Sequence, residues 1–435
     1  MKKLISFILV LVMALTLFAA CDTADQPIVD GAPQNGTGDD TTTTPPADGG
    51  EEEPQPQKTI PTALKINGAD ISEYTIVYAY NPNRAEYAKY PTLVTQDTEY
   101  DKQTAENLAA LIKTHFGATV GVVRDGEQSA TAKEIIIGST NRGLVEGTLG
   151  SFTSDKDYSI RENSGKIVIC GKTYGATWHA AEDFITAALA QDAEVATIAS
   201  GYNVRAKANM LVVGCIGDSL TNGSKPSGYT SSVSDSVRRD IVAYPAVLQR
   251  IAWKDMVVYN YGLGGRTMIE NFVWTDGSGN HGWTSCQYYQ PCMQNAVNID
   301  LALIMLGTND SNRDRATAAG YNFGTSSYKN VFIASCKSIV DQLKVKNPNM
   351  RIALLNCPIA FNAFESDMMT CIRPYQRSAA QQLGLDFLDM YTATMKNTTS
   401  SEYPDGLHPN DEGYTKYAII INGLIDPIVK EMLGK

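Results

Sequence analysis

The chain has 435 residues, of which 43% are apolar and 19% are charged, and its formal net charge is -11. This length and composition are typical of a globular protein with two domains and exclude a fibrous chain. Because proteins that bind nucleic acids present a basic surface to the phosphates, the acidic balance argues against DNA or RNA as a partner.

Residues 1–21 have the pattern of an export signal. Lys2 and Lys3 precede an apolar run that ends directly before Cys21. A charged start, an apolar stretch and small residues in this order are typical of a secretory signal peptide. The residues around Cys21 resemble a bacterial lipoprotein cleavage site, which implies lipidation of Cys21 and a membrane-anchored, extracytoplasmic protein. Ordinary cleavage with secretion, or an uncleaved signal anchor, is the alternative.

Residues 22–58 form a low-complexity segment of Thr, Pro, Gly, Asp and Glu with almost no large apolar side chain. Such a segment cannot bury enough apolar surface to offset the entropy lost on folding. We therefore expect a disordered linker that holds the folded part of the chain away from the membrane.

Residues 59–205 mix strand and helix patterns and are predicted to form a smaller α/β domain. Runs rich in β-branched residues indicate strands at Tyr74–Tyr78 and Glu134–Gly138, and apolar residues at helical spacing indicate helices in Ala105–Phe116 and Ala176–Leu189. The region vaguely resembles the α/β accessory domains that precede catalytic domains in some carbohydrate-active enzymes.

Residues 209–435 alternate strand and helix patterns, as a parallel sheet requires. We predict a three-layer α/β/α sandwich that ends in a helix from Asp411 to Leu433. The predicted strands are Leu211–Ile216, Met256–Asn260, Leu301–Leu306, Arg351–Cys357 and Leu385–Leu388. The predicted helices between them are Tyr244–Ile251, Tyr328–Val345 and Ile372–Leu383.

Four segments of this second part carry the residues that acyl-transfer chemistry needs. Gly217–Gly223, Gly262–Thr267 and Gly307–Asp310 each directly follow a predicted strand, and Asp405–Pro409 precedes the last helix. Because the carboxyl ends of parallel strands lie at one edge of a sheet, the loops that follow them converge. We therefore expect the four segments to form one site.

The residue types in these segments fit the roles of a serine hydrolase. A serine nucleophile needs an adjacent base, and the base needs an acceptor on its other ring nitrogen. Ser219, His408 and Asp405 fit these three catalytic roles. The oxyanion of the tetrahedral intermediate needs fixed donors, which the backbone N–H groups of Ser219 and Gly265 and the side-chain amide of Asn309 can supply.

The four segments, in this order, resemble the sequence blocks of the SGNH hydrolase superfamily, also called the GDSL family of esterases and lipases. In that family the residues matched here by Ser219, Gly265, Asn309 and His408 form the catalytic centre and the oxyanion hole. The resemblance implies a flavodoxin-like α/β fold and an ester hydrolase without a metal or organic cofactor. It covers the second part of the chain and not the first.

Two loops, Ser224–Val242 and Ile269–Asn298, are longer than the resemblance implies. The second contains four aromatic residues that either stack on sugar rings as a substrate-binding surface or pack the loop itself. These residues are Trp274, Trp283, Tyr288 and Tyr289.

The cysteines do not form a recognisable disulfide or metal-binding framework. Cys286 and Cys292 are the only close pair, and the sequence leaves a disulfide between them open.

Export and tethering favour a substrate met at the cell surface. We expect a serine esterase that acts on acyl, foremost acetyl, esters of a poly- or oligosaccharide. A lipase or lysophospholipase is one alternative, and a non-catalytic glycan-binding lipoprotein is another.

Overall fold

The computed structural model describes residues 58–80 and 99–435, except for residues 232 and 275. The predicted signal peptide with Cys21, and the predicted linker up to residue 57, lie outside the described residues. Residues Gln57–Lys435 form one compact unit. We call residues 59–208 of this unit the first folded region and residues 209–435 the second, and the division into two domains stays a prediction. No described helix is long and apolar enough to cross a membrane.

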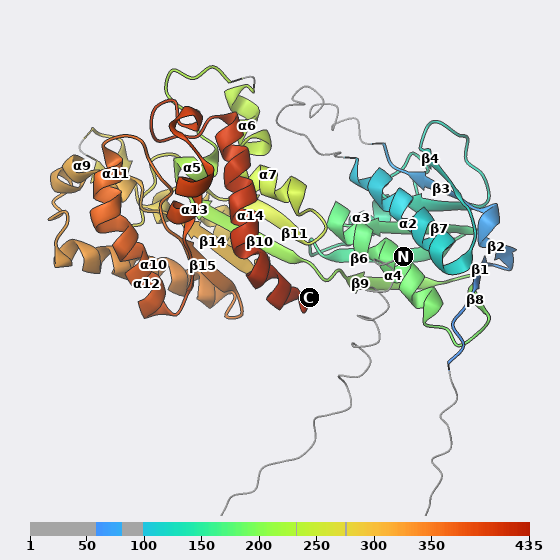
Figure 1. Cartoon of the computed structure of the whole chain (residues 1–435). Coiled ribbons are helices and arrows are strands. Elements are labelled where there is room, and N and C mark those ends of the chain that lie inside the picture. Colours follow the sequence, from blue (N-terminus) through green and yellow to red (C-terminus); the bar gives the residue numbers. More distant parts are fainter. Residues whose placement is uncertain (1–57, 81–98, 232, 275) are drawn as a thin grey trace, which may run out of the picture. The chain divides into compact units, whose positions relative to one another are not determined.

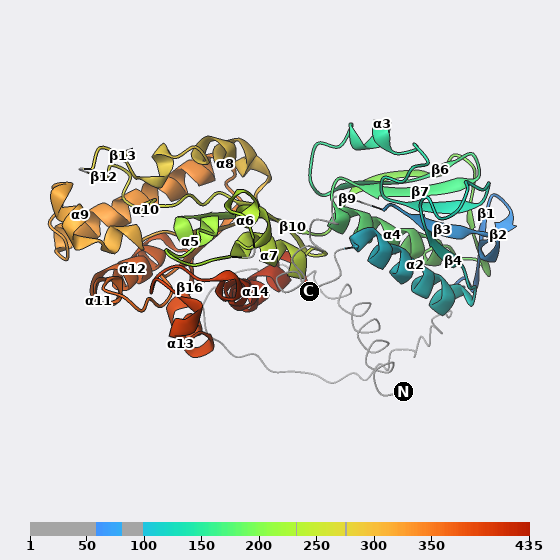
Figure 2. The same ribbon diagram turned by 90° about the horizontal axis from the view of Figure 1, so that it is seen from above.

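The first folded region contains a six-stranded mixed sheet with the order β4-β3-β5-β7-β6-β9. The strands from β4 to β7 run parallel, whereas β6 pairs antiparallel with β7 and β9. Helices α2 and α4 lie side by side along this sheet (Figure 2). The bounds are β3 Thr75–Tyr78, α2 Tyr100–Phe116, β4 Gly121–Arg124, β5 Glu134–Ile137, β6 Asp157–Asn163, β7 Lys166–Gly171, α4 Tyr174–Leu189 and β9 Asn203–Lys207.

A second, three-stranded sheet completes this region and has the order β2-β1-β8. Its strands are β1 Ala63–Ile66, β2 Ala69–Asp70 and β8 Val195–Ile198. The strands and helices that the sequence predicts for this region are present, so its α/β character is confirmed.

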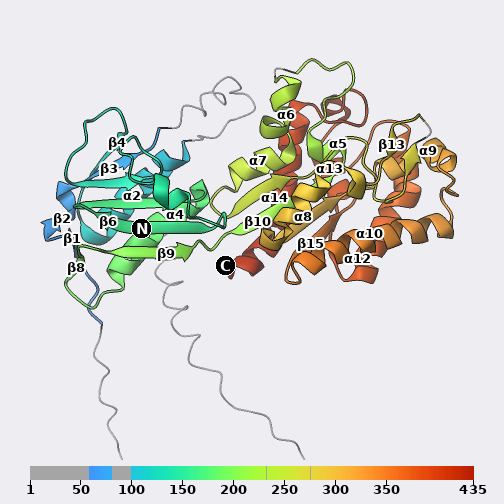
Figure 3. The same cartoon turned by 180° about the vertical axis from the view of Figure 1, so that it is seen from behind.

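The second folded region is a three-layer α/β/α sandwich around a parallel sheet with the order β11-β10-β14-β15-β16. Helices α10 and α12 pack together on one side of the sheet, and α7 and α14 pack together on the other (Figures 1 and 3). The predicted fold class is confirmed. The bounds are β10 Leu211–Gly217, α7 Tyr244–Ile251, β11 Met256–Asn260, β14 Leu301–Met305, α10 Ser326–Lys346, β15 Arg351–Leu355, α12 Arg373–Leu383, β16 Asp386–Leu388 and α14 Asp411–Leu433.

The central strands of this sheet are apolar throughout because both of their faces are buried. In β10, Val212 and Ile216 belong to the core beneath α10 and α12, while Leu211, Val213 and Cys215 belong to the core beneath α7 and α14. Successive side chains of a strand point to opposite faces. The unbroken apolar run therefore fills two cores at once.

Gly217 ends β10 at the point where the chain turns into the functional loops. A Cβ atom at this position would lie 2.0 Å from Thr221 Oγ1 and 2.9 Å from the carbonyl oxygen of Met305. Gly423, on the exposed face of α14, contrasts with it, since a Cβ there would meet no atom within 4 Å.

Alanine at these two glycines should change stability in opposite directions. Gly217→Ala should lower the free energy of unfolding by about 1–3 kcal/mol, because a methyl group must be forced into a filled site. Gly423→Ala should raise it by about 0.5–1 kcal/mol, because alanine is the better helix former. Urea unfolding of both variants measures the two changes, and a stable Gly217→Ala protein would contradict the tight packing at the end of β10.

Candidate active site

The predicted nucleophile stands at the first position of a short helix, α5 (Ser219–Asn222), directly after β10. Asp218 caps this helix, since its carboxylate accepts a hydrogen bond of 2.9 Å from the N–H of Leu220. At the other end of α5, Gly223 has a φ of 86° and closes the helix in the left-handed conformation. Ser219 is thereby held at the carboxyl edge of the sheet.

Ser219 and His408 are in hydrogen-bond contact, with 3.0 Å between Ser219 Oγ and His408 Nε2. The other ring nitrogen, Nδ1, lies 2.9 Å from Asp405 Oδ2. Because a carboxylate can only accept, the proton of the neutral imidazole belongs on Nδ1, and Nε2 is left to accept the proton of the serine hydroxyl. The three groups are thus connected in the order expected for a nucleophile, a base and an orienting acid.

Asp405 is fixed by the backbone as well as by the imidazole. Its carboxylate accepts N–H groups from Leu407, His408 and Ser227 at 2.9, 2.7 and 2.9 Å. Burial raises the pKa of Asp405, but these hydrogen bonds outweigh burial and hold the pKa below its usual value. The group beside the imidazole is therefore an ionised carboxylate.

The glycine block lies beside the serine. A Cβ atom at Gly264 would stand 3.9 Å from Ser219 Cβ, and Gly265 follows with a φ of 75°. Asn309 Nδ2 donates to the carbonyl oxygen of Arg266 at 3.0 Å, which ties the third predicted segment to this block. The structure thus brings together all four segments that the sequence predicts to converge.

The aromatic residues of the loop Ile269–Asn298 pack against other residues of the second folded region. Trp283 is fully buried, and its Nε1 donates to the carbonyl oxygen of Tyr261 at 2.9 Å. Tyr289 packs edge-on against Trp283, with 5.5 Å between the ring centroids, and its hydroxyl donates to Gln342. The prediction of a sugar-stacking surface is wrong for Trp283, which belongs to the core of the loop.

Trp274 has neither ring face free. The His281 ring stacks on one face at 3.3 Å, and the guanidinium of Arg315 lies 3.5 Å from the ring centroid. Tyr288 likewise carries the guanidinium of Arg239 at 3.9 Å. These contacts favour packing, the other predicted role, and a substrate contact of the half-buried Trp274, Tyr288 and Tyr289 stays a prediction. Their type was visible in the sequence, but their burial was not.

Two consecutive arginines of the loop Ser224–Val242 contact the segments of the site, a role that could not be predicted from the sequence. Arg238 is buried and forms an ion pair of 2.5 Å with Asp411, the first residue of α14. Its Nε also donates to the carbonyl oxygen of Gly223 at 3.2 Å. Arg238 thereby joins the end of the serine helix to the segment that follows His408.

Arg239 points to the opposite side of α5. Its guanidinium donates to Asn222 Oδ1 at 2.6 Å and to the carbonyl oxygen of Gly262 at 2.7 Å, and it also donates to the carbonyl oxygen of Asn260. These acceptors belong to the serine helix, the glycine block and β11. Arg239 thereby joins these three segments.

All seven described cysteines are free and buried. Cys286 and Cys292 belong to this set, so the structure has no disulfide between them.

The parallel sheet and the contacts among Ser219, His408 and Asp405 are those expected of an α/β hydrolase. Residues 215–416 match the family described as GDSL-like lipase/acylhydrolase. The second folded region belongs to this family of carboxylic ester hydrolases, and the resemblance stated from its four segments is confirmed.

The chain is also similar to individual proteins. It is 27% identical over 237 residues to an acetylxylan esterase of Xylanibacter ruminicola, an alignment that covers 50% of this chain and 44% of that protein. The chain thus spans less than half the length of this curated relative. A carbohydrate acetylesterase family member from Sinorhizobium meliloti is 22% identical, with a TM-score of 0.38, covering 52% of this chain and all of that one. An acetylxylan esterase from Geobacillus stearothermophilus is 18% identical, with a TM-score of 0.34, covering 49% and 94%.

Two buried carboxyl groups lie under the site. Burial raises the pKa of Asp218 to about 7 and that of Asp310 to about 6, against hydrogen bonds from backbone N–H groups that oppose the shift. Asp310 accepts the N–H groups of Met268 and Ile269 at 2.9 and 3.0 Å, which fixes the chain after the glycine block.

The raised pKa of Asp218 predicts a pH-dependent stability. A folded-state pKa above the unfolded value contributes to the free energy of unfolding. This contribution is complete below about pH 4 and is lost as the pH rises to about 7. The free energy of unfolding of the protein, relative to Asp218→Asn, should therefore fall between about pH 4 and pH 7. Urea unfolding across this range measures it.

Asp405→Asn should show the opposite dependence on pH. Because the pKa of Asp405 is lower in the folded protein than in the unfolded one, its carboxylate stabilises the fold at a pH above the unfolded pKa, and this contribution is lost as the pH falls below about 4. A difference between the protein and Asp218→Asn that stays constant with pH would contradict a protonatable carboxyl under the nucleophile.

Proposed function

We propose that the second folded region is a serine esterase that removes acyl groups, foremost acetyl, from carbohydrate at the cell surface. The observation that carries the proposal is the pair of contacts that His408 makes, 3.0 Å to Ser219 and 2.9 Å to Asp405. The name of the curated relative, an acetylxylan esterase, supports an acetylated polysaccharide as the substrate class.

In the proposed reaction His408 takes the proton of Ser219 as Oγ attacks the ester carbonyl carbon. The carbonyl oxygen gains a negative charge, and the N–H groups of Ser219 and Gly265 and the amide of Asn309 stabilise it. Asn309 suits this role because one N–H of its amide is fixed on the carbonyl oxygen of Arg266, which orients the other.

The intermediate then collapses. The bond between the carbonyl carbon and the sugar oxygen breaks, and His408 returns its proton to the leaving alcohol. The acyl group stays on Ser219 until a water molecule, deprotonated by His408, attacks the same carbon. The bond between that carbon and Oγ then breaks, His408 returns the proton to Oγ, and the acid is released. Asp405 keeps the imidazole oriented and stabilises its protonated form throughout.

Substitutions in the four segments test this assignment. Ser219→Ala should lower kcat for p-nitrophenyl acetate and for acetylated xylan by about 10³-fold or more, because no nucleophile remains. Asn309→Ala should lower kcat by about 10²–10³-fold through loss of one donor to the oxyanion. If Asp405 mainly orients the base, Asp405→Asn should cost less than His408→Ala.

Ser236→Ala, at an exposed serine of α6 (Asp235–Ile241), is the matched control and should leave kcat unchanged. Acetate release that survives Ser219→Ala would refute the proposed nucleophile. A preference for long acyl chains or lysophospholipid would move the substrate class to lipids, and no turnover of any ester would favour a glycan-binding protein.

We also propose that the protein is exported and anchored to a membrane through lipid on Cys21. The pattern of residues 1–21 supports this. Cys21→Ala should abolish incorporation of labelled palmitate and move the protein out of the membrane fraction of cells that produce it. Retention of the variant in the membrane would indicate an uncleaved anchor, and wild-type protein in the medium would indicate ordinary cleavage.

A further inference from the structure

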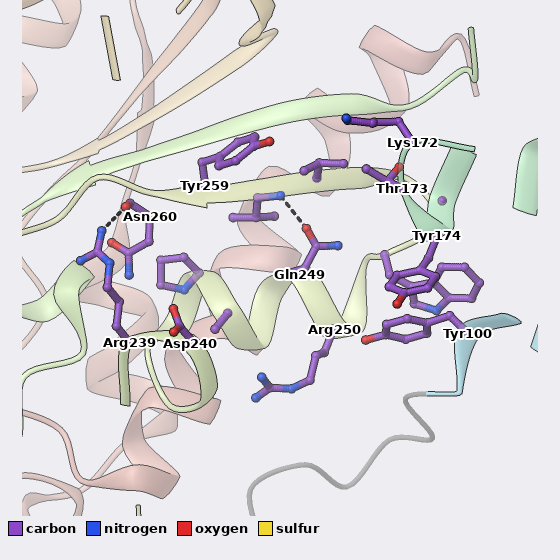
Figure 4. Close-up of a pocket in the computed structure, with 16 residues that line it drawn as sticks. Tyr100, Lys172, Thr173, Tyr174, Arg239, Asp240, Gln249, Arg250, Tyr259 and Asn260 are labelled. Carbon is purple, nitrogen blue, oxygen red and sulfur yellow. Dashed lines mark hydrogen bonds between the residues drawn. The ribbon is translucent and has the colours of Figure 1, made fainter. Parts of the chain in front are cut away.

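A cavity of about 620 Å³ lies beside β11 and α7, and its lining residues lie outside the four segments of the site (Figure 4). Ligand cavities in proteins commonly have volumes of roughly 300–1,000 Å³ and occur where separate parts of a fold meet. The second folded region contributes residues from α7 and β11 to this one, and the first contributes Lys172–Gly175 and Tyr100.

The wall between the two folded regions is closely packed. The rings of Tyr100 and Trp253 stack with 4.6 Å between their centroids, and His179 Nε2 lies 3.0 Å from the carbonyl oxygen of Lys254. At Gly175 a Cβ atom would stand 2.5 Å from the carbonyl oxygen of Trp253. The absence of a side chain at Gly175 therefore allows this approach, which shapes one end of the cavity.

At three residues of β11, side chains already bond the backbone groups that a further strand would need at its open edge. Gln249 accepts the N–H of Val258 at 2.7 Å and donates to the carbonyl oxygen of Met256 at 3.2 Å. Arg239 donates to the carbonyl oxygen of Asn260. Because these backbone groups are already bonded, a ligand in the cavity would be bound by the lining side chains and not by pairing with β11.

The lining combines apolar and polar side chains. The apolar ones include Pro245, Ala246, Val257 and Val258. The polar ones include Lys172, Asp240, Gln249 and Asn260. Sugar rings have apolar C–H faces and a periphery of hydroxyl groups, so a lining of both kinds matches both parts of a neutral saccharide.

One lining residue connects the cavity to the serine helix. The Arg239 side chain lines the cavity and bonds to Asn222, the last residue of α5, and to Gly262 of the glycine block. Arg239 therefore contacts both the cavity and two of the four segments that form the site.

We propose that this cavity binds sugar residues of the acylated polysaccharide that flank the residue carrying the ester. The inference rests on the proposed function and extends it, because it gives the first folded region a part in substrate binding. Cleavage of a small ester needs only the four segments, whereas efficient cleavage of a long saccharide also needs the cavity.

The test fills the cavity in the full chain with Ala246→Trp. Activity is measured on p-nitrophenyl acetate and on acetylated xylo-oligosaccharides from disaccharide to hexasaccharide. For the wild-type protein kcat/KM should rise with chain length. For Ala246→Trp the value on the hexasaccharide should fall about tenfold or more, while that on p-nitrophenyl acetate should stay within about twofold.

Ala187→Trp, at a half-buried alanine of α4 outside the cavity, is the matched control and should change neither activity. Lys172→Ala removes a polar lining group without adding bulk. It replaces Ala246→Trp as the test variant if that protein does not fold. An unchanged rate on the hexasaccharide in a folded Ala246→Trp protein would overturn the proposal.

Calorimetric titration of Ser219→Ala with unacetylated xylohexaose separates this inference from the proposed function. Binding that Ala246→Trp removes would uphold the cavity even if no ester were hydrolysed. Ser219-dependent hydrolysis of p-nitrophenyl acetate without saccharide binding would overturn the cavity and leave the esterase intact.

Discussion

The Asp405 carboxylate is the group on which the arrangement of the site depends. It accepts three backbone N–H groups and faces the His408 ring at 2.9 Å. One of the donors, Ser227, belongs to the long loop that follows the serine helix, so a single carboxylate joins that loop to the histidine. An ionised group so well satisfied can stay charged while partly buried, and it thereby fixes the tautomer in which the imidazole can accept a proton from Ser219.

The short helix α5, which carries Ser219, needs contacts from other segments to be stable. A helix of one turn is not stable alone, because its nucleation costs more than its few hydrogen bonds return. Asp218 caps its start, and Arg238 and Arg239 contact its end from two sides. The buried Tyr414 of α14 adds a hydrogen bond of 2.9 Å to the carbonyl oxygen of Ser224. The lengthened loop thus supports the short helix that carries Ser219.

The sequence was sufficient for the framework and for the convergence of the four segments. Each predicted strand of the second folded region agrees with the structure within two residues, because continuous apolar runs bounded by polar or turn residues are local signals. The part played by Arg239 could not be predicted from the sequence, because the contacts of Arg239 with Gly262 and Asn260 depend on the path of a loop in three dimensions. The burial of Trp283 was equally hidden, because composition does not distinguish a covered aromatic ring from an open one.

The side chains along the free edge of β11 have a consequence for the protein when many copies of it lie close together. An exposed strand edge is a template on which another chain can add a strand, and crowding favours such additions. Gln249 occupies the donor of Val258 and the acceptor of Met256, and Arg239 occupies the acceptor of Asn260. With these groups already bonded, this edge of the parallel sheet is protected against edge-to-edge aggregation of neighbouring molecules.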